Sequence, residues 1–378
     1  MKKVSVGVLT SLHPAFDIRI FHRECKTLAR AGYDVTLIAP HGNDLECDGI
    51  KIKAVAKSLH RGRLTRGAQM MWRVYRSAIQ LSADIYHFHD PELIPIGLLL
   101  RLQGKKVIYD AHEDLPADLR SREGSFFPDW SRVYVAWFIK LIEEFSSRWV
   151  TAIVTAGEDI TARLNFFNRN VVTVENFPLL EEFVSIPCPV ERYRSHRIVS
   201  FGGMSEARSI GEQIEALGQL PDELTIRLVI GGRPAEPKLL ERLKTLKGWK
   251  RVDDLGQAAR PEMIGALAQA SAALILFKPG PNHYAIRSNR LYESLAAGLP
   301  VIVPNFEAWK ALVEEAGCGI CVNPLDPVAI AEAMSFLCTH SEEAALMGAR
   351  GRKLVLEKFN WRKEETKLVS LYGRLAQA

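Results

Sequence analysis

The chain lacks long apolar runs, and its cysteines follow no regular spacing. The most apolar stretch, residues 133–142, is far shorter than the roughly 20 residues that a membrane-spanning helix needs, and it contains Lys140. No cleavable apolar stretch follows the N-terminal Met1-Lys2-Lys3 segment. The cysteines are too scattered for a disulfide framework: Cys25, Cys47, Cys188, Cys318, Cys321 and Cys338. We therefore expect a reduced, cytoplasmic protein that does not span a membrane.

Low-complexity segments and a strong charge of one sign are also absent. The 49 Lys and Arg residues nearly balance the 44 Asp and Glu residues, which leaves a net charge of +5, and the known nucleic-acid-binding motifs are missing. With 378 residues, of which 47% are hydrophobic and 25% charged, the chain is long enough for two globular domains. The composition thus predicts a globular protein without a nucleic-acid partner.

Short apolar runs typical of buried strands alternate with amphipathic segments along the whole chain. In the first half the expected strands are Val4–Leu9, Asp34–Ala39, Asp84–Phe88, Lys106–Tyr109, Thr151–Thr155 and Val171–Val174. In the second half they are Arg197–Phe201, Thr225–Ile230, Ala272–Leu276, Pro300–Val303 and Gly319–Val322. This alternation predicts an α/β protein with two Rossmann-like, doubly wound parallel-sheet domains.

Three prolines, Pro178, Pro187 and Pro189, interrupt regular structure before the second series of strands begins. We therefore expect an N-terminal domain over residues 1–180, a second domain over residues 181–360 and a C-terminal helix over residues 361–378. Ligands of open parallel sheets bind beyond the carboxyl ends of the strands. The functional residues should accordingly lie in strand-to-helix loops that face a cleft between the two domains.

One such loop covers residues 201–209. Gly202 and Gly203 allow a ligand to approach the backbone, the following helix N-terminus attracts anions, and Arg208 adds a charge suited to phosphate. The alternative is a tight turn with a solvent-exposed arginine.

A longer loop covers residues 277–290 and opens a second helix. Ser288 or Asn289 is expected to cap this helix, whose free N–H groups can hold a phosphate. Glu293 lies four residues after Asn289, on the same helix face, where a carboxylate can accept hydrogen bonds from sugar hydroxyls. Alternatively, Glu293 only complements the helix dipole from the first turn.

These segments, together with others, resemble a known family. The residues that carry the resemblance are the strand and helix from Val199 to Leu217, the run Leu228-Val229-Ile230-Gly231-Gly232, the segment from Glu293 to Ile302 with Ala296-Ala297-Gly298-Leu299-Pro300, and Phe359-Asn360-Trp361. They are similar to the family-four retaining glycosyltransferases of the GT-B fold, over almost the whole chain. The resemblance implies transfer of a sugar from a nucleotide-sugar to a hydroxyl of a glycan or lipid-linked glycan. It also implies a C-terminal helix that crosses back to the N-terminal domain.

By this resemblance, Glu293 is the second glutamate of an E-x7-E motif and holds the ribose, and Arg208 takes the place of a diphosphate-binding lysine. Two positions depart from the family pattern, because Ala285 stands at the first glutamate and Gly203 at an arginine. Asn289-Arg290 resembles the Asn-Lys of a subgroup, so Arg290 would supply the missing cation. No Asp-x-Asp triplet occurs, which argues against the metal-dependent GT-A glycosyltransferases. We expect metal-independent transfer with no cofactor beyond the nucleotide-sugar substrate.

Histidines and acids follow two strands of the N-terminal domain. His112 matches the family histidine that contacts the donor sugar and diphosphate, and is our candidate for the catalytic residue. His89 matches a family histidine at the preceding strand end. In the alternative interpretation His87 points into the core and His89 caps the helix that starts at Pro91. Metal binding by these residues is a minor alternative, because no helix carries a paired i,i+4 ligand motif.

The remaining candidates concern the acceptor side. Asp17 and Arg19 either meet the acceptor or pair with each other on the surface. Basic and aromatic residues alternate over residues 61–76, and an aromatic-rich helix with Trp137 and Phe138 follows Phe126-Phe127-Pro128. These segments either bind peripherally to the inner face of a membrane or form an ordinary solvated helix face. The Cys318-x-x-Cys321 pair has no second pair and is expected to be structural.

Two other functions fit the same sequence. A sugar-nucleotide 2-epimerase has a similar two-domain shape and needs no acceptor. A non-catalytic sugar-nucleotide-binding subunit would explain Ala285 and Gly203.

Overall fold

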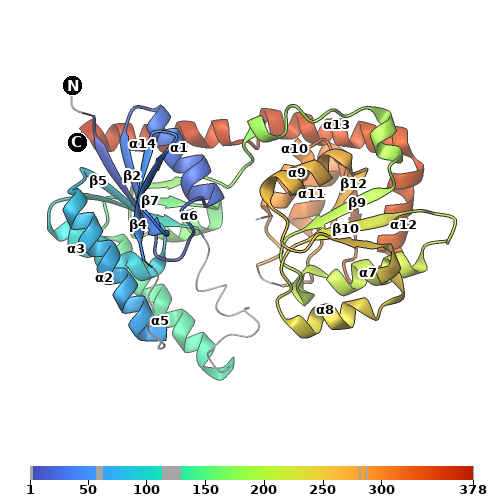
Figure 1. Cartoon of the computed structure of the whole chain (residues 1–378), viewed down its shortest axis with the longest axis horizontal. Coiled ribbons are helices and arrows are strands. Elements are labelled where there is room, and N and C mark those ends of the chain that lie inside the picture. Colours follow the sequence, from blue (N-terminus) through green and yellow to red (C-terminus); the bar gives the residue numbers. More distant parts are fainter. Residues whose placement is uncertain (1–2, 57–62, 113–128, 281, 287, 378) are drawn as a thin grey trace. The chain divides into compact units, whose positions relative to one another are not determined.

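The computed structural model describes residues 3–56, 63–112, 129–280, 282–286 and 288–377. The chain divides into two compact units (Figure 1). The N-terminal unit contains the chain up to Asn176 together with the segment that starts at Trp361, and the C-terminal unit is Phe177–Asn360. Both units are α/β, as the sequence predicts, and no helix within the described ranges is long and apolar enough to cross a membrane.

A sheet of eight strands forms the centre of the N-terminal unit, in the order β3-β4-β2-β1-β5-β6-β7-β8. All neighbouring strands pair in parallel except β3, which is antiparallel to β4. The strands are β1 (Ser5–Leu9), β2 (Asp34–Pro40), β3 (Leu45–Cys47), β4 (Ile50–Val55), β5 (Ile85–Phe88), β6 (Lys106–Ala111), β7 (Ala152–Thr155) and β8 (Val171–Thr173). The sequence prediction missed the edge strand β3 and its neighbour β4, in which apolar residues alternate with charged ones.

Alternate residues of the strands point to opposite faces of this sheet, so each face has its own helices. On one face Tyr86, Phe88 and Tyr109 pack with apolar residues of α2 and α3. His87 and Asp110 point to the opposite face, toward η1 and α14. The helical elements are the π-helix η1 (Ile18–Cys25), α1 (Lys26–Arg30), α2 (Arg63–Leu81), the 3₁₀ turn η2 (Pro91–Leu93), α3 (Ile94–Leu102), α5 (Asp129–Ser147), α6 (Glu158–Leu164) and α14 (Trp361–Gln377).

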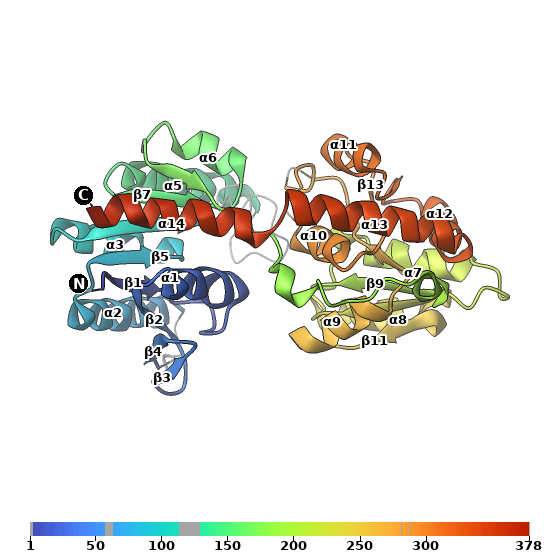
Figure 2. The same cartoon turned by 90° about the horizontal axis from the view of Figure 1, so that it is seen from above.

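Helix α14 crosses back to the N-terminal unit, as the family resemblance implies (Figure 2). Its apolar face is buried in that unit through Trp361, Leu368 and Tyr372. The Trp361 indole N–H donates to Thr27 Oγ1 over 2.9 Å, and Lys106 Nζ donates to the Leu375 carbonyl near the other end of the helix. Burial of these large side chains explains why the helix belongs to this unit.

The C-terminal unit contains a fully parallel sheet in the order β11-β10-β9-β12-β13-β14, the order of a Rossmann fold. Its strands are β9 (Arg197–Phe201), β10 (Arg227–Gly231), β11 (Val252–Asp254), β12 (Ala272–Leu274), β13 (Val301–Pro304) and β14 (Gly319–Val322). Its longer helices are α7 (Ile210–Gln219), α8 (Pro237–Lys244), α9 (Arg260–Gln269), α10 (Asn289–Ala296), α11 (Glu307–Ala316), α12 (Pro327–Thr339) and α13 (Ser341–Glu357). The sequence prediction missed only the short edge strand β11 in this sheet.

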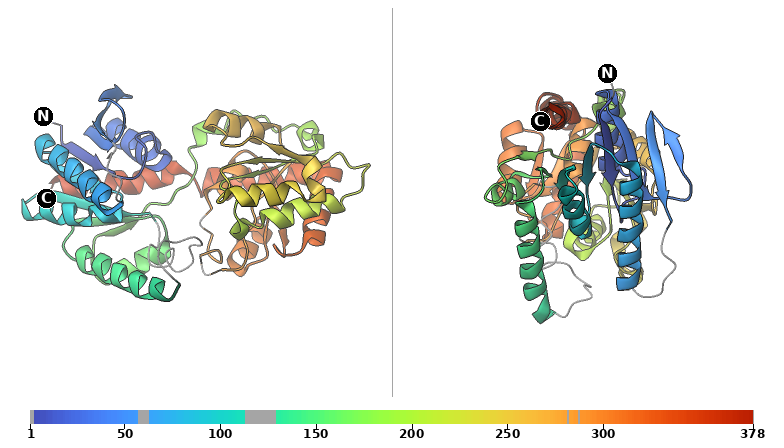
Figure 3. Two further views of the ribbon diagram at one scale, coloured as in Figure 1. Left: turned by 60° about the horizontal axis from the view of Figure 1, so that its bottom comes forward. Right: turned by 90° about the vertical axis from the view of Figure 1, so that its left-hand side faces the viewer.

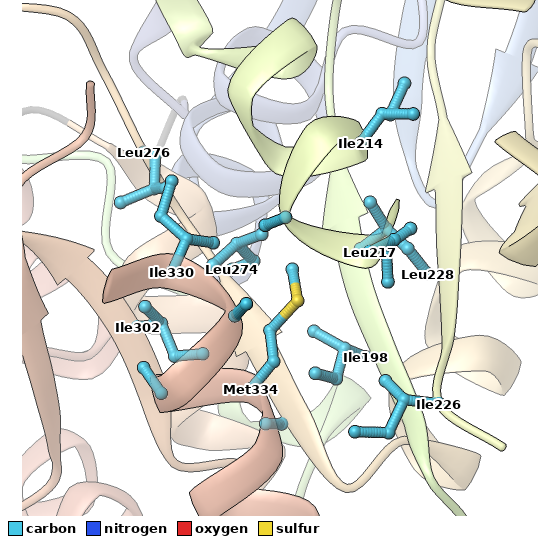
Figure 4. Close-up of a cluster of buried hydrophobic side chains, with 14 of the residues drawn as sticks. Ile198, Ile214, Leu217, Ile226, Leu228, Leu274, Leu276, Ile302, Ile330 and Met334 are labelled. Atoms are coloured by element: carbon cyan, nitrogen blue, oxygen red, sulfur yellow. The ribbon is translucent and has the colours of Figure 1, made fainter. Parts of the chain in front are cut away.

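Consecutive strand residues contribute to two separate cores, one on each face of this sheet. Leu228 and Ile230 face α7, α8 and α12, whereas Val229 between them faces α9, α10 and α11. Figure 4 shows the first of these cores, in which side chains from β9, β10, β12 and β13 meet those of α7 and α12. Strands buried on both faces explain the continuous apolar runs in the sequence. The carboxyl ends of the strands are thereby held in fixed positions.

Candidate functional site

The first group of candidate residues lies at the carboxyl end of β9. Gly202 follows the strand with a φ of +113°, a conformation that side chains rarely adopt. A Cβ atom at this position would overlap with the Nη1 atoms of both Arg208 and Arg290. The positive φ favours glycine here, and any side chain would also have to displace two guanidinium groups. Gly203 is different, since an added Cβ there would only reach ordinary contact with the Arg233 carbonyl at 3.6 Å.

Arg208 and Arg290 share their surroundings. Their guanidinium carbons lie 5.7 and 5.9 Å from the centre of the Phe277 ring, and Arg290 Nη1 donates to the Phe201 carbonyl. Burial lowers the pKa of Arg208, and burial together with the nearby charge of Arg208 lowers the pKa of Arg290 to about 9. Arg208 Nη1 is buried without a hydrogen-bond partner among the described residues. Two crowded cations with an unused donor are suited to an anionic ligand.

Two helix N-termini point to the same region. Ser209 is the N-cap of α7, in a left-handed conformation with a φ of 50°, and Ser288 is the N-cap of α10. Each hydroxyl is buried, and neither has a hydrogen-bond partner in the part of the chain that the structure describes. A pocket of about 330 Å³ opens beside α10 and is lined by residues that include Arg208, Phe277, Ala285, Ser288, Asn289 and Arg290. The pocket wall thus includes two cations, the N-terminus of α10 and the Ser288 hydroxyl.

Glu293 lies on α10 with Arg290, but its ion-pair partner is a different arginine. It is 5% exposed, and its Oε1 is 2.8 Å from Arg260 Nη1. Arg260 also pairs with Glu182, at 2.5 Å between Nη2 and Oε2. Glu293 is beyond the first turn of the helix, so the interpretation as a first-turn dipole partner is wrong. Nothing in the sequence singles out Arg260 as the partner of Glu293, because it is a single basic residue at the start of α9.

In the N-terminal unit, three candidate residues gather around the Asp110 side chain on β6. The Asp110 Oδ2 atom is 3.2 Å from both His89 Nδ1 and His112 Nε2, and these two nitrogens are 2.8 Å apart. Arg19 binds the same carboxylate through Nε and Nη2, each at 2.9 Å. His112, His89 and Arg19 therefore form one buried or half-buried cluster whose centre is an aspartate that we did not single out from the sequence.

Arg19 and Asp17 do not form a surface pair, so that alternative is wrong. Arg19 is 4% exposed, and the carboxylates of Asp110 and Glu24 raise its pKa despite its burial. Asp17 instead caps η1, since its Oδ1 accepts from the backbone N–H groups of Arg19 and Ile20. Although burial opposes the shift, the contact with His13 and these backbone donors lower the pKa of Asp17. Both residues hold the first loop of the sheet in place.

The two other histidine interpretations have different outcomes. His87 is fully buried, as the alternative interpretation predicted, and its Nδ1 is 2.9 Å from the Tyr372 hydroxyl on α14. His89 does not cap the helical turn at Pro91, because Asp90 takes that N-cap position and His89 faces His112. Burial lowers the pKa of both His87 and His89.

Ligand atoms of Glu24, His87, His89 and Asp110 lie within 4.8 Å of one another, a spacing that could hold a metal ion. However, the Arg19 guanidinium already contacts both carboxylates, because its Nε is 3.0 Å from Glu24 Oε1 and 2.9 Å from Asp110 Oδ2. A positive charge thus already lies in this cluster.

All six cysteines are free, including Cys318 and Cys321 at β14.

The chain resembles solved structures over its whole length. Sucrose-phosphate synthase from Thermosynechococcus elongatus matches with a TM-score of 0.76 and 16% identity, with all of both chains covered. Anabaena HepE in complex with UDP and glucose matches with a TM-score of 0.71 and 14% identity, over 98% of this chain and all of that one. WaaG, a glycosyltransferase involved in lipopolysaccharide biosynthesis, matches with a TM-score of 0.70 and 16% identity, over 97% and 99% of the two chains. At these identities the likeness shows the fold, which is the predicted GT-B fold.

Sequence comparison identifies the family. Although no curated protein sequence matches the chain, two family models do. The model of Glycosyltransferase Family 4 matches residues 19–177, and the model of Glycosyl transferases group 1 matches residues 195–340. The first match covers the strands that carry His89, Asp110 and His112, and the second covers the loops that carry Arg208 and Arg290. The chain therefore belongs to the family 4, group 1 glycosyltransferases.

Proposed function

We propose that the protein transfers a sugar from a nucleotide-sugar to a hydroxyl acceptor, with retention at the anomeric carbon and without a metal ion. The observation that carries the proposal is the convergence of Arg208 and Arg290 on Gly202, beside the N-termini of α7 and α10. In the reaction the bond from the anomeric carbon to the diphosphate oxygen breaks and a bond to the acceptor oxygen forms, while the proton of the acceptor hydroxyl passes to the leaving diphosphate. The leaving diphosphate gains negative charge, which two fixed cations and helix N–H groups stabilise.

The relatives support a nucleotide-sugar as the donor. Anabaena HepE was solved in complex with UDP and with UDP-glucose, and it shares the fold of this chain. In the present chain Glu293 would accept hydrogen bonds from the ribose, with Arg260 holding its carboxylate. His112 would contact the transferred sugar. In this proposal Arg208 and Arg290 of the C-terminal unit take the place of a metal ion beside the diphosphate.

A panel of nucleotide-sugars, assayed with and without crude glycan or lipid-linked acceptors, tests the function. Release of the nucleoside diphosphate that depends on the acceptor is expected. Isomerisation of the donor without an acceptor would instead identify a 2-epimerase, and binding of the donor without turnover would identify a non-catalytic subunit. The anomeric configuration of the product, read by NMR, tests retention.

For the acceptor we propose a lipid-linked glycan at the inner face of a membrane, reached by peripheral binding of a cytoplasmic protein. Helix α5, which Figure 3 shows in two views, carries a row of exposed apolar residues at helical spacing: Val133, Tyr134, Trp137, Phe138, Leu141, Ile142 and Phe145. On α2, Trp72 is also exposed, and so are Arg66 and Arg76. Arg61 and Phe126-Phe127-Pro128 lie outside the described residues. Aromatic rings beside cations suit the interface of an anionic membrane.

A further inference from the structure

The loop between β12 and α10 carries a histidine to which the proposed function gives no role. His283 lines the pocket of about 330 Å³ beside α10, together with Arg208, Ser288 and Arg290. The side chain is half-buried. Its contacts show which of its two ring nitrogens carries a proton, so the kind of ligand group that it can bind follows from the structure.

The position of His283 is fixed from two sides. Its backbone carbonyl accepts a hydrogen bond from the indole N–H of Trp309 on α11, over 2.9 Å. The centre of its ring lies 5.0 Å from that of Phe277. The same Phe277 ring contacts the guanidinium groups of Arg208 and Arg290. The imidazole is therefore held next to the two cations of the pocket.

The proton of the neutral His283 ring lies on Nδ1. This nitrogen is 2.8 Å from the backbone carbonyl oxygen of Lys278. A carbonyl oxygen only accepts hydrogen bonds, so Nδ1 must be the donor. A neutral imidazole has one N–H group, and Nε2 is consequently left with a lone pair. Among the residues that the structure describes, Nε2 has no hydrogen-bond partner.

The pocket wall thus combines two kinds of polar group. The guanidinium groups of Arg208 and Arg290 suit an anion, whereas the lone pair of His283 Nε2 would repel a phosphate oxygen, because both are acceptors. This nitrogen needs a donor, such as a hydroxyl. None of the described residues in the wall is an aspartate or a glutamate, so no carboxylate of theirs competes for that hydroxyl. A ligand with both an anionic group and hydroxyls fits this wall.

We propose that His283 is a specificity-determining residue whose Nε2 accepts a hydrogen bond from one hydroxyl of the transferred sugar. This step rests on the proposed function, in which Arg208 and Arg290 bind the diphosphate. The sugar is attached directly to the diphosphate, so it lies within reach of the same pocket wall. A site that binds a substrate hydroxyl discriminates against a sugar that lacks it. The position of the proton on His283 does not depend on the proposed function.

Nuclear magnetic resonance of protein labelled with ¹⁵N-histidine tests the position of the proton in the free protein. The signals of His283 are assigned from their loss in His283→Phe. At a pH where the ring is neutral, we expect the ¹⁵N shifts of a protonated Nδ1 and an unprotonated Nε2. A wild-type His283 with its proton on Nε2 would overturn the inference, whether or not any variant folds.

Titration calorimetry tests the contact with the sugar. The probes are UDP, UDP-glucose and analogues of UDP-glucose in which fluorine, which cannot donate a hydrogen bond, replaces one sugar hydroxyl at a time. One analogue should bind the wild type about five- to tenfold more weakly than UDP-glucose does. In His283→Phe the affinity for UDP-glucose should fall by a similar factor, that analogue should bind as well as UDP-glucose, and the affinity for UDP should not change. His283→Gln should keep part of the discrimination, because an amide oxygen also accepts.

His340→Phe is the matched control. His340 also stacks on a phenylalanine, Phe336, with ring centres 4.4 Å apart, and its Nδ1 is 3.1 Å from the carbonyl of that residue, but it does not line the pocket. This variant should leave every affinity unchanged. A wild type that binds neither UDP nor UDP-glucose would refute the proposed function. A wild type that binds both would overturn only the inference on His283 if no analogue bound more weakly, if the weakening persisted in His283→Phe, or if His283→Phe lost affinity equally for UDP and UDP-glucose.

Discussion

Arg208 and Arg290 place their Nη1 atoms in the space that a side chain at Gly202 would fill, although both groups carry the same charge. The Phe277 ring lies within cation–π range of both guanidinium groups, which partly offsets their repulsion. The lowered pKa values of both arginines show that the free protein holds these charges at a cost. An anion that binds between them relieves this cost, and for that reason the pair is the centre of the predictions on donor binding.

Nucleoside diphosphates are expected to stabilise the protein without divalent metal. UDP at about 100 times its Kd should add about 2.7 kcal/mol to the free energy of unfolding, because only the folded protein holds the two arginines together. The measurement is thermal unfolding with UDP in the presence of a chelator, with magnesium added back in a parallel sample. Stabilisation that appears only with magnesium would contradict a metal-independent site.

Gly202→Ala should weaken UDP binding strongly. The added methyl group overlaps with both guanidinium groups, so at least one charge-assisted hydrogen bond to the diphosphate is lost, at about 1.5 to 3 kcal/mol. Gly256→Ala is the control, because Gly256 also has a positive φ, +59°, but no described atom lies within 4 Å of an added Cβ. Both variants should lose some stability from backbone strain. Equal UDP affinities in titration calorimetry would show that the space beside Gly202 is not used.

The two candidate loops of the C-terminal unit could be located from the sequence because the pattern that marks them is local. The Gly202–Arg208 loop is recognisable because a glycine pair and an arginine closely follow a strand. The start of α10 is marked by Ser288, Asn289 and Arg290. The parallel α/β architecture of both units follows from the regular alternation of apolar runs and amphipathic segments. The edge strands β3 and β11 and the strand β4 beside β3 were missed, since they lack the continuous apolar run of a strand that is buried on both faces.

The partners of the other candidate residues depend on contacts between positions that are distant in the sequence. Arg19 reaches Asp110 across 91 positions of sequence, and Glu293 reaches Arg260 only when α9 and α10 pack on the same sheet face. A single aspartate within a strand looks like any polar residue in the sequence. Only the parallel register of β5 and β6 brings His89 and His112 together beside it. These partners could not be predicted from local spacing.

Glu293→Gln should lower the affinity for UDP by about 1.5 to 3 kcal/mol, if the carboxylate accepts hydrogen bonds from the ribose. Glu182→Gln removes the other carboxylate that binds Arg260 and serves as the matched control. Both variants should unfold at a lower temperature, because each deprives Arg260 of one ionic partner. Only Glu293→Gln should change UDP binding in calorimetry. An affinity that falls equally in both would mean that Glu293 acts through Arg260 and has no direct contact with the ribose.

Glu175→Gln should stabilise the protein more at pH 8 than at pH 5. Burial and the neighbouring Glu364 raise the pKa of Glu175 to about 7, from an ordinary value of 4.5. Between these values the folded state holds a proton that the unfolded state has released, so the contribution of this group to stability decreases as the pH rises. The gain at pH 8 should be about 1 kcal/mol, since partial exposure screens the carboxylate. Urea unfolding at both pH values measures it, and an equal gain at pH 5 and pH 8 would contradict the raised pKa.

The row of exposed apolar residues on α5 should bind the protein to anionic vesicles. Trp137 and Phe138 are 57% and 59% exposed, and transfer of such large aromatic side chains into a membrane interface is favourable. Wild-type protein should sediment with vesicles that contain phosphatidylserine at low salt, and it should be partly released at high salt as the charges are screened. Replacement of Trp137 and Phe138 by serine should abolish sedimentation and leave UDP affinity unchanged.

Leu346→Ser on α13 of the C-terminal unit is the control for the vesicle experiment, because Leu346 is also 59% exposed and its replacement should not affect vesicle binding. Arg66→Gln tests the basic contribution separately, and it should reduce binding only at low salt. If the wild type stays in solution with anionic vesicles at low salt, the lipid-linked acceptor is refuted and a soluble glycan becomes the better candidate.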